Sequence, residues 1–165
     1  MAQNFTSSAT SINSTKLPAV YRKVSFSAPL VLDYGCGRYT DHILNHLTGK
    51  IYLPYDPYNQ PDDVNRSSMF IVSLAQKEAK PVDVICSNVL NVIDDEDTIR
   101  SIAKRIETIV NRTGGTGSVT VYEGNRSGSG RQTGSDQYQR NEPLRNYLRY
   151  FTNATIKNGM IVVGR

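Results

Sequence analysis

The sequence predicts an α/β fold with a mostly parallel β-sheet, helices on both faces and a C-terminal antiparallel hairpin. Short apolar runs alternate with segments of helical periodicity, which is the pattern of strand–helix–strand units. Glycine or proline bounds several of these runs, at points where a strand or helix must end. The last two apolar runs stand on either side of Asn158-Gly159, a dipeptide typical of tight hairpin turns.

The first half of the chain is expected to alternate strands and helices. Proline ends the second strand and the second helix, because it continues neither ladder. Residues 69–74 also fit a strand, so their state stays open. The expected elements are a strand at 30–34, a glycine turn at 35–37, a helix at 40–46, a strand at 51–55, a loop at 62–67 and a helix at 69–80.

The second half continues the alternation and then closes with the hairpin. An amphipathic helix with isoleucine on one face ends at Gly114-Gly115. The expected elements are a strand at 82–86, that helix at 95–112, a strand at 118–122, a segment without regular structure at 124–141, a helix at 143–151 and hairpin strands at 154–156 and 160–163.

Length and composition predict one domain. The chain has 165 residues, and residues 1–15 are rich in Ser, Thr and Asn, which predicts a flexible N-terminal arm before a domain at 16–165. No apolar run reaches the roughly 18 residues of a membrane span, so we expect no membrane partner. With two cysteines and no secretory signal, the expected compartment is the cytoplasm, or the host cytoplasm for a phage protein.

The net positive charge of the chain comes entirely from its C-terminal part. Residues 1–121 hold twelve basic and twelve acidic side chains, whereas residues 122–165 hold seven basic and three acidic ones. The whole net charge of +4 therefore belongs to the last 44 residues. An anionic partner is expected at that end.

Polar residues follow three of the expected strands. Asp33 and the glycine turn close the first strand, Asp56 closes the second, and Cys86-Ser87-Asn88 closes the third. Open α/β sheets bind ligands beyond the carboxyl ends of their strands, at the switch in strand order. Glycine admits a ligand close to the backbone, and a carboxylate after the next strand can accept both hydroxyls of a ribose. An ordinary strand-to-helix turn and a turn aspartate are the structural alternatives.

These segments resemble the motifs of class I S-adenosylmethionine-dependent methyltransferases, whose fold is Rossmann-like. Val31–Gly37, Tyr55–Tyr58 and Val82–Leu90 are similar in order and spacing to the first, second and fourth motifs of that family, over about residues 29 to 122. The chain looks most like small methyltransferase-like proteins of phages and bacterial DNA-modification systems. Those proteins carry a further segment, which is present here as Tyr122–Gly124, Ser127–Arg131 and Tyr138–Asn141.

The resemblance implies S-adenosylmethionine as cofactor and assigns residues to it. Tyr39 stands at the third glycine of the usual Gly-x-Gly-x-Gly, and the motifs of adenine-N6 and cytosine-C5 DNA methyltransferases are missing, which argues against those mechanisms. The implied cofactor residues are Asp33, Gly35, Cys36 and Gly37 at the methionine end, Asp56 at the ribose, Pro57 and Tyr58 beside the adenine, and Asn88 and Val89 at the transfer site.

Methyl transfer needs few catalytic groups. In-line alignment in a site without water supplies much of the effect, and a base is needed only where the acceptor must lose a proton. The candidate catalytic residues are Glu123, Tyr138 and Asn88. A solvated carboxylate at the end of a strand is the alternative interpretation of Glu123.

Segment 124–141 is the candidate substrate site. Arg126, Arg131 and Arg140 stand among Gly, Ser and Gln, a combination that can clamp phosphates. A flexible loop, a subunit contact and a lid over the cofactor are the alternatives. We expect no metal site, since His42 and His46 share a helix face without a third ligand.

The sequence as a whole predicts a methyltransferase whose acceptor is either a nucleic acid, bound through residues 122–165, or another anionic substrate. Two other functions stay open. One is an enzyme that cleaves S-adenosylmethionine. The other is a non-catalytic module that senses the cofactor or binds nucleic acid.

Overall fold

The computed structural model describes residues 17–38, 40–135 and 137–164, so the expected arm at 1–15 lies outside it. Its helices are α2 (Val20–Lys23), α3 (Thr40–His46), α4 (Asp62–Lys77) and α5 (Glu96–Thr113), with 3-10 helices η1 (Leu90–Val92) and η2 (Leu144–Tyr150). Its strands are β1 (Leu30–Tyr34), β2 (Ile51–Tyr55), β3 (Val82–Ser87), β4 (Gly117–Thr120), β5 (Arg131–Gly134), β6 (Gln137–Gln139), β7 (Ala154–Lys157) and β8 (Met160–Val163).

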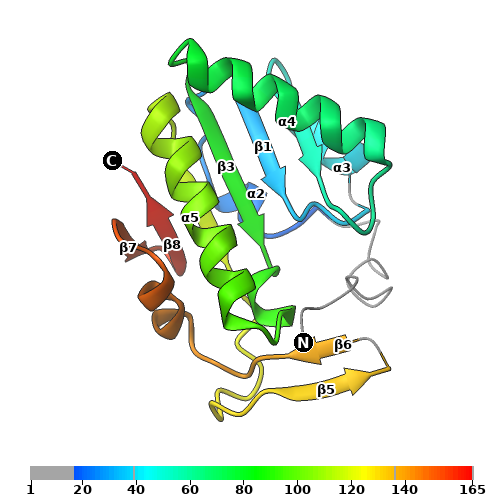
Figure 1. Cartoon of the computed structure of the whole chain (residues 1–165), viewed down its shortest axis with the longest axis vertical. Coiled ribbons are helices and arrows are strands. Elements are labelled where there is room, and N and C mark those ends of the chain that lie inside the picture. The colour runs from blue at the N-terminus through cyan, green and yellow to red at the C-terminus, as the bar shows by residue number, and fades with distance from the viewer. Residues whose placement is uncertain (1–16, 39, 136, 165) are drawn as a thin grey trace.

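Six strands form one mixed sheet in the order β2-β1-β3-β4-β8-β7, and β5 pairs with β6 in a separate hairpin (Figure 1). The pairs β1–β2, β1–β3 and β3–β4 are parallel, whereas β8 is antiparallel to both β4 and β7. The predicted mostly parallel sheet and closing hairpin are confirmed. The chain runs from β1 to β2 on one side and then crosses to β3 on the other, so the strand order switches at β1.

Helices cover both faces of the sheet, as expected. Alternate residues of β1 point to opposite faces, with Leu32 in the core under α4 and α5 and Val31 in the core with α2 and α3. In Figure 1, α4 and α5 lie in front of the sheet and α2 and α3 lie behind it. The larger core is the one between the sheet and α4 and α5.

The region expected to be a loop at 62–67 is instead the first part of α4, which begins at Asp62 and ends at Lys77 rather than at 80. The apolar periodicity of this helix is interrupted because two of its buried positions are polar residues that bond to β2 and to the turn after it. The side chain of buried Asn65 accepts the backbone N–H of Asp56 and donates to the carbonyl of the same residue. Ser68 donates to the carbonyl of Pro54 at 2.7 Å.

Further elements differ from expectation, among them the 3-10 helix η1 at Leu90–Val92, which was not predicted. Helix α2 was not predicted, and its four residues carry no pattern long enough to recognise. Segment 124–141 contains the β5–β6 hairpin rather than irregular chain alone. Residues Leu144–Tyr150 form a 3-10 helix in place of an α-helix. The terminal hairpin turns at Asn158 and Gly159, both with positive φ, as predicted.

One edge of the main sheet is formed by β2. Pro54 lies within this edge strand and has no N–H to offer a further strand, and its carbonyl already accepts the hydroxyl of Ser68. Among the residues that the structure describes, no helix has both the length and the apolar character needed to cross a membrane.

Candidate functional site

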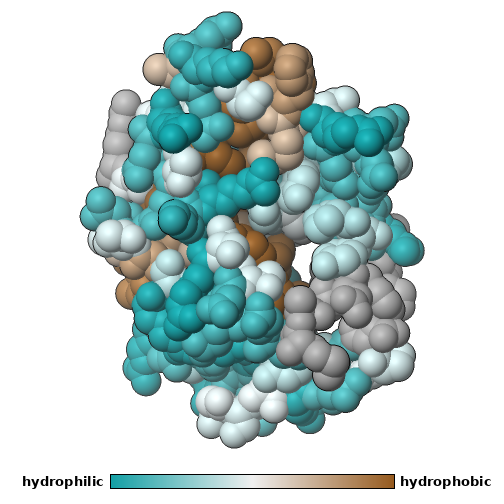
Figure 2. Space-filling view, in the orientation of Figure 1, coloured by the Kyte–Doolittle hydropathy of each residue, from teal (hydrophilic) through white to brown (hydrophobic). Residues whose placement is uncertain are grey.

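A crevice opens beside the switch in strand order, between the carboxyl ends of β1 and β2 and the first half of α5. Its volume is about 420 Å³. In Figure 2, apolar surface shows in the middle of the molecule, between α4 and α5. The crevice is lined by Tyr34, Gly35, Tyr55, Asp56, Pro57, Tyr58, Val89, Val92, Ile93, Asp95, Asp97, Thr98, Ser101, Ile102 and Arg105.

The three predicted motifs meet at this crevice. Gly35 follows β1, Asp56 to Tyr58 follow β2, and Val89 follows β3, and all of them line it. These residues are far apart in sequence, and the parallel register of the strands brings their carboxyl ends together. The other candidate residues do not line the crevice: they are Asp33, Cys36, Gly37, Asn88, Glu123, Arg126, Arg131, Tyr138 and Arg140.

An aromatic wall forms the back of the crevice. Tyr34 and Tyr55 are paired residues at the ends of β1 and β2, and their ring centroids are 4.8 Å apart. The guanidinium of Arg105 lies 6.0 Å from the centroid of the Tyr55 ring. Burial raises the pKa of Tyr34 to about 12, so its hydroxyl stays protonated at neutral pH. This wall can stack a planar ligand, with half-exposed Tyr58 at its rim.

The sequence analysis did not identify this wall. Tyr34 and Tyr55 end two predicted strands and Arg105 lies within a predicted helix, and the sequence singles out none of the three as a site residue. The available signal was that both strands end in tyrosine. The place of Arg105 in this wall follows only from the packing of α5 against these strand ends, which the sequence does not show.

Asp33 does not face the crevice, contrary to the role implied for it at the methionine end. Its carboxylate points into the core with α2 and α3, where it accepts hydrogen bonds from the hydroxyls of Tyr21 (2.6 Å) and Tyr52 (3.0 Å). Only 3% of the residue is exposed, and this burial raises the pKa of its carboxyl group to about 6. Asp33 therefore supports the glycine turn from behind.

Asp56 lies on the wall of the crevice, but its carboxylate is already occupied. Its two oxygens accept hydrogen bonds from the backbone N–H groups of Gly37, Tyr58 and Asn59 and from the Asn59 amide, at 2.9 to 3.2 Å. A carboxylate has about four acceptor positions, and only 1% of Asp56 is exposed. Asp56 organises two turns, and in this arrangement it has no acceptor position left for a ribose.

The glycine turn likewise offers no free amides to a ligand. The N–H groups of Gly35 and Cys36 both donate to the carbonyl of Tyr55, at 2.7 and 3.2 Å. Gly35 has a φ of +85°, and a Cβ at this position would overlap Cγ2 of Val89. Glycine is thus required by the approach of Val89 and by the backbone conformation. Tyr39, at the position of the third glycine, lies outside the described residues.

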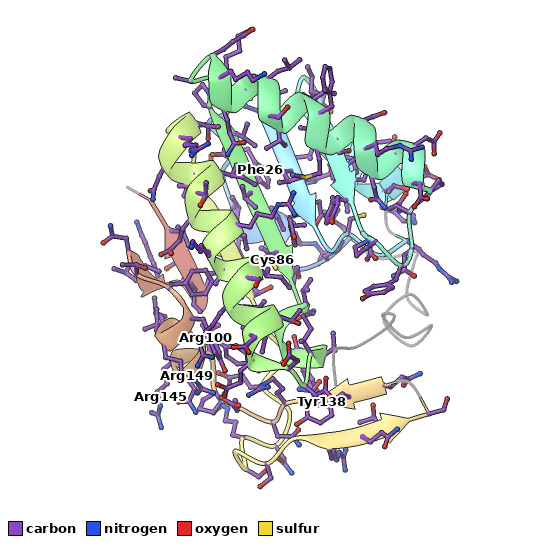
Figure 3. The ribbon with its side chains drawn as sticks, viewed as in Figure 1. Phe26, Cys86, Arg100, Tyr138, Arg145 and Arg149 are labelled. Carbon is purple, nitrogen blue, oxygen red and sulfur yellow. The ribbon has the colours of Figure 1, made fainter. Side chains whose placement is uncertain are left out.

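The two buried cysteines lie on opposite faces of the sheet. Cys86 belongs to the core under α5 (Figure 3). Burial raises the pKa of Cys36. The thiol of Cys36 bonds to Tyr52, which belongs to the core with α2 and α3. Burial also raises the pKa of Cys86, so both thiols are protonated at neutral pH.

Asn88 lies at the carboxyl edge of the sheet. It is exposed, has a φ of 57°, and its N–H donates to the carbonyl of Thr120 at 2.9 Å. Asparagine is one of the few residues that adopt this backbone conformation at low cost. It turns the chain out of β3 and sets Val89 against Gly35.

Neither of the other two catalytic candidates reaches the crevice. Glu123 accepts the backbone N–H of Leu144 at 2.6 Å and pairs with Arg126. The Leu144 N–H, together with Arg126, lowers the pKa of Glu123, which makes it a weak base at neutral pH. Tyr138 lies on β6, outside the crevice (Figure 3), and its hydroxyl packs closely against Gly130.

The three candidate arginines have different environments. Arg131 begins β5 and is exposed, whereas Arg126 is exposed but paired with Glu123. Arg140 is only 7% exposed and bonds to Glu142 and to backbone carbonyls, which corrects its expected role in substrate binding. Outside segment 124–141, Arg100, Arg145 and Arg149 gather where η2 meets α5 (Figure 3).

Within residues 17–38, 40–135 and 137–164, no three His, Cys, Asp or Glu side chains gather as ligands for a metal ion. Comparisons with known proteins found no match: no family model, no curated protein and no solved structure is significantly similar to this chain.

Proposed function

We propose that the chain binds S-adenosylmethionine in the crevice and transfers its methyl group, as a Rossmann-like protein of the class I methyltransferase kind. The observation that carries the proposal is the convergence of Gly35, Asp56–Tyr58 and Val89 on one crevice at the switch in strand order. Residues that share a motif pattern in the sequence thus also share a place in the fold.

The size and chemistry of the crevice support a nucleoside ligand. Its volume of about 420 Å³ lies within the usual range for small-molecule sites. The rings of Tyr34, Tyr55 and Tyr58 and the ring of Pro57 offer flat apolar surface to an adenine. Since the carboxylate of Asp56 is occupied and the hydroxyl of Thr98 donates to Asp95, the hydroxyl of Ser101 on α5 is the lining group that we assign to the ribose.

Bound S-adenosylmethionine supplies a methyl group that already carries a good leaving group, its sulfonium sulfur. The protein has then to hold the acceptor in line with that methyl group and to exclude water. Val89 and Ile93 are buried and apolar, and we assign them to the exclusion of water. Because Glu123 is a weak base here, the proposal favours an acceptor that is nucleophilic without losing a proton.

We propose a nucleic acid or another anionic molecule as the methyl acceptor, approaching over the β5–β6 hairpin. Exposed Arg131 on the hairpin and exposed Arg145 on η2 support this assignment, together with the net positive charge of residues 122–165. The commitment of Glu123 to Leu144 also favours a second candidate function, a cofactor-binding module without catalysis.

Calorimetric titration with S-adenosylmethionine and S-adenosylhomocysteine tests the proposal. We expect both to bind, and we expect Tyr58→Ala to weaken binding roughly 5- to 100-fold through lost stacking. Tyr122→Ala is the matched control, since Tyr122 is 63% exposed and lies outside the crevice. No binding by the native chain would overturn the proposal.

Chromatography of the products separates the three functions. Formation of S-adenosylhomocysteine only when DNA, RNA or cell extract is added supports methyl transfer. Turnover without an acceptor supports cofactor cleavage, and binding without turnover supports the module.

A further inference from the structure

The loop from Asn88 to Asp95, between β3 and α5, provides one wall of the crevice. Residues at the base of the β5–β6 hairpin form hydrogen bonds with this loop. Arg140 follows β6 directly and is 7% exposed. Its Nη1 donates to the carbonyls of Ile93 and Asp94, both at 3.2 Å. Its backbone N–H donates to the carbonyl of Asn91 at 2.7 Å. One residue therefore holds three carbonyls of the loop.

Asn91 makes the reciprocal contacts. It is 2% exposed, and its Nδ2 donates to Oε1 of Gln139 at 3.2 Å. Its Oδ1 accepts the N–H of Tyr122 at 3.3 Å, and Gln139 donates in turn to the carbonyl of Tyr122 at 3.0 Å. The crevice loop, the exit of β4 and the hairpin are thus joined in a closed ring of hydrogen bonds.

The guanidinium of Arg140 is itself fixed. Its Nε and Nη2 donate to Oε1 of Glu142 at 3.2 and 2.9 Å, and Arg149 donates to the other oxygen of Glu142 at 3.0 Å. A buried charge is tolerated only when it is paired and hydrogen-bonded. The planar guanidinium can bond to Glu142 along one edge and to the loop carbonyls with Nη1, a geometry that lysine cannot reproduce.

We propose that Arg140 and Asn91 are positioning residues, which hold the crevice wall at Val89–Ile93 from the base of the hairpin. The contacts on which this depends are independent of the ligand, and only the effect on cofactor affinity rests on the proposed function. Coupling between two sites is reciprocal. Through these contacts we expect a molecule bound to the hairpin and a ligand in the crevice to change each other's affinity by the same factor.

Arg140→Lys and Arg149→Lys form a matched pair for the test. Both retain a positive charge near Glu142, but the guanidinium of Arg149 bonds to Glu142, Asn146, Glu96 and Tyr150, whereas that of Arg140 bonds directly to the loop. We expect backbone amides of residues 88–94 to exchange hydrogen about tenfold faster in Arg140→Lys, and at the native rate in Arg149→Lys. Gln139→Ala, at a half-buried residue, is a milder second variant and should accelerate the same amides.

Equal exchange rates in the native chain, Arg140→Lys and Gln139→Ala would overturn the positioning role. So would equal acceleration in Arg149→Lys, since that result indicates general destabilisation. This measurement needs no ligand, so it decides the contacts even if the proposed function fails.

Titration with S-adenosylhomocysteine gives the second readout. We expect Arg140→Lys to weaken binding at least fivefold relative to Arg149→Lys, at a temperature at which circular dichroism shows both variants to be fully folded. Unchanged affinity together with faster exchange would overturn the link to the crevice. Absence of binding by the native chain would overturn the proposed function and this link with it. The exchange experiment would then still decide whether Arg140 holds the loop.

Discussion

The hydroxyl of Tyr21 donates a 2.6 Å hydrogen bond to Oδ2 of Asp33, from a helix that precedes the sheet to the strand that leads into the glycine turn. Tyr52 donates to the same oxygen at 3.0 Å. A titratable group is thereby held inside an apolar core, directly behind the candidate site. Burial raises its pKa to about 6, and this gives the stability of the protein a definite pH dependence.

Asp33 should make the protein less stable as pH rises from about 4 to 7. The carboxyl pKa is about 6 in the folded chain and 3.8 as the reference value, so the folded state binds the proton more tightly. The resulting stability is present below the lower pKa and is lost as pH rises through the higher one. Relative to Asp33→Asn, the native chain should lose up to about 3 kcal/mol of unfolding free energy.

Urea unfolding at pH 4, 5, 6 and 7 measures this loss. Asp63→Asn, at an exposed residue in the first turn of α4, is the control and should follow the native curve. Parallel curves for the native chain and Asp33→Asn would contradict the prediction.

Tyr21→Phe should destabilise the protein more at high pH than at low pH. Removal of the hydroxyl takes away a hydrogen bond to a carboxylate at pH 8 but to a neutral carboxyl group at pH 4. The expected cost is about 2 kcal/mol at pH 8 and about 1 kcal/mol at pH 4. Tyr122→Phe, at an exposed tyrosine, should cost nothing at either pH. The pH dependence of the urea midpoints decides between these outcomes.

Gly35→Ala should be strongly destabilising, because the new Cβ would overlap Val89 and φ is +85°. The overlap costs about 1 to 3 kcal/mol and the backbone conformation about 1 kcal/mol more. Gly49→Ala is the matched control, since its φ is +77° with no atom within 4 Å, so it should show the backbone cost alone.

A double-mutant cycle with Val89→Ala separates the two causes. The pair Gly35→Ala and Val89→Ala should be less destabilising than the sum of the single changes, by the overlap energy. Additive changes in the free energy of unfolding would show that Val89 does not impose glycine at position 35.

The strand ends of β1, β2 and β3 could be predicted from sequence, but the hydrogen bonds of their polar residues could not. Asp33 and Asp56 follow the pattern of ligand-binding carboxylates, yet Asp33 bonds to two tyrosines and Asp56 to the backbone of neighbouring turns. For Asp33 these partners come from α2 and β2, and for Asp56 they come from the glycine turn and from the turn before α4. Helix α2 is too short to predict, and Asn65 makes the start of α4 resemble a loop.

Arg140 illustrates the same limit. Charge and composition predict exposure for an arginine in a glycine-rich segment, and that prediction holds for Arg131. Burial of Arg140 depends on Glu142, two residues away, and on loop carbonyls more than forty residues away. Pairing with a nearby acid is visible in a sequence, whereas capture by a distant backbone is not.

Arg131→Ala should reduce the salt dependence of DNA binding, if the acceptor proposal is correct. Loss of one phosphate contact lowers the slope of log affinity against log salt by about 1 and weakens binding to all sequences alike. Arg66→Ala, on the exposed side of α4, is the control. Fluorescence anisotropy at several salt concentrations gives the slope for the native chain and for each variant. Equal slopes for the native chain and Arg131→Ala would show that Arg131 does not contact the DNA.

Glu123→Gln should preserve any methyl transfer. The amide oxygen can still accept the N–H of Leu144, and only the exposed ion pair with Arg126 is lost. Glu123→Ala leaves that N–H without its partner and should cost about 1 kcal/mol of stability. Complete loss of turnover in Glu123→Gln, with unchanged stability, would restore Glu123 as a catalytic base.

The proline in the edge strand β2 affects how this protein behaves at high concentration. Exposed edge strands are templates for intermolecular pairing and fibril growth. At β2, Pro54 provides no donor and its carbonyl already accepts the hydroxyl of Ser68, which disfavours extension of the sheet there by a second molecule. The crevice thus lies beside a sheet edge that is protected against aggregation.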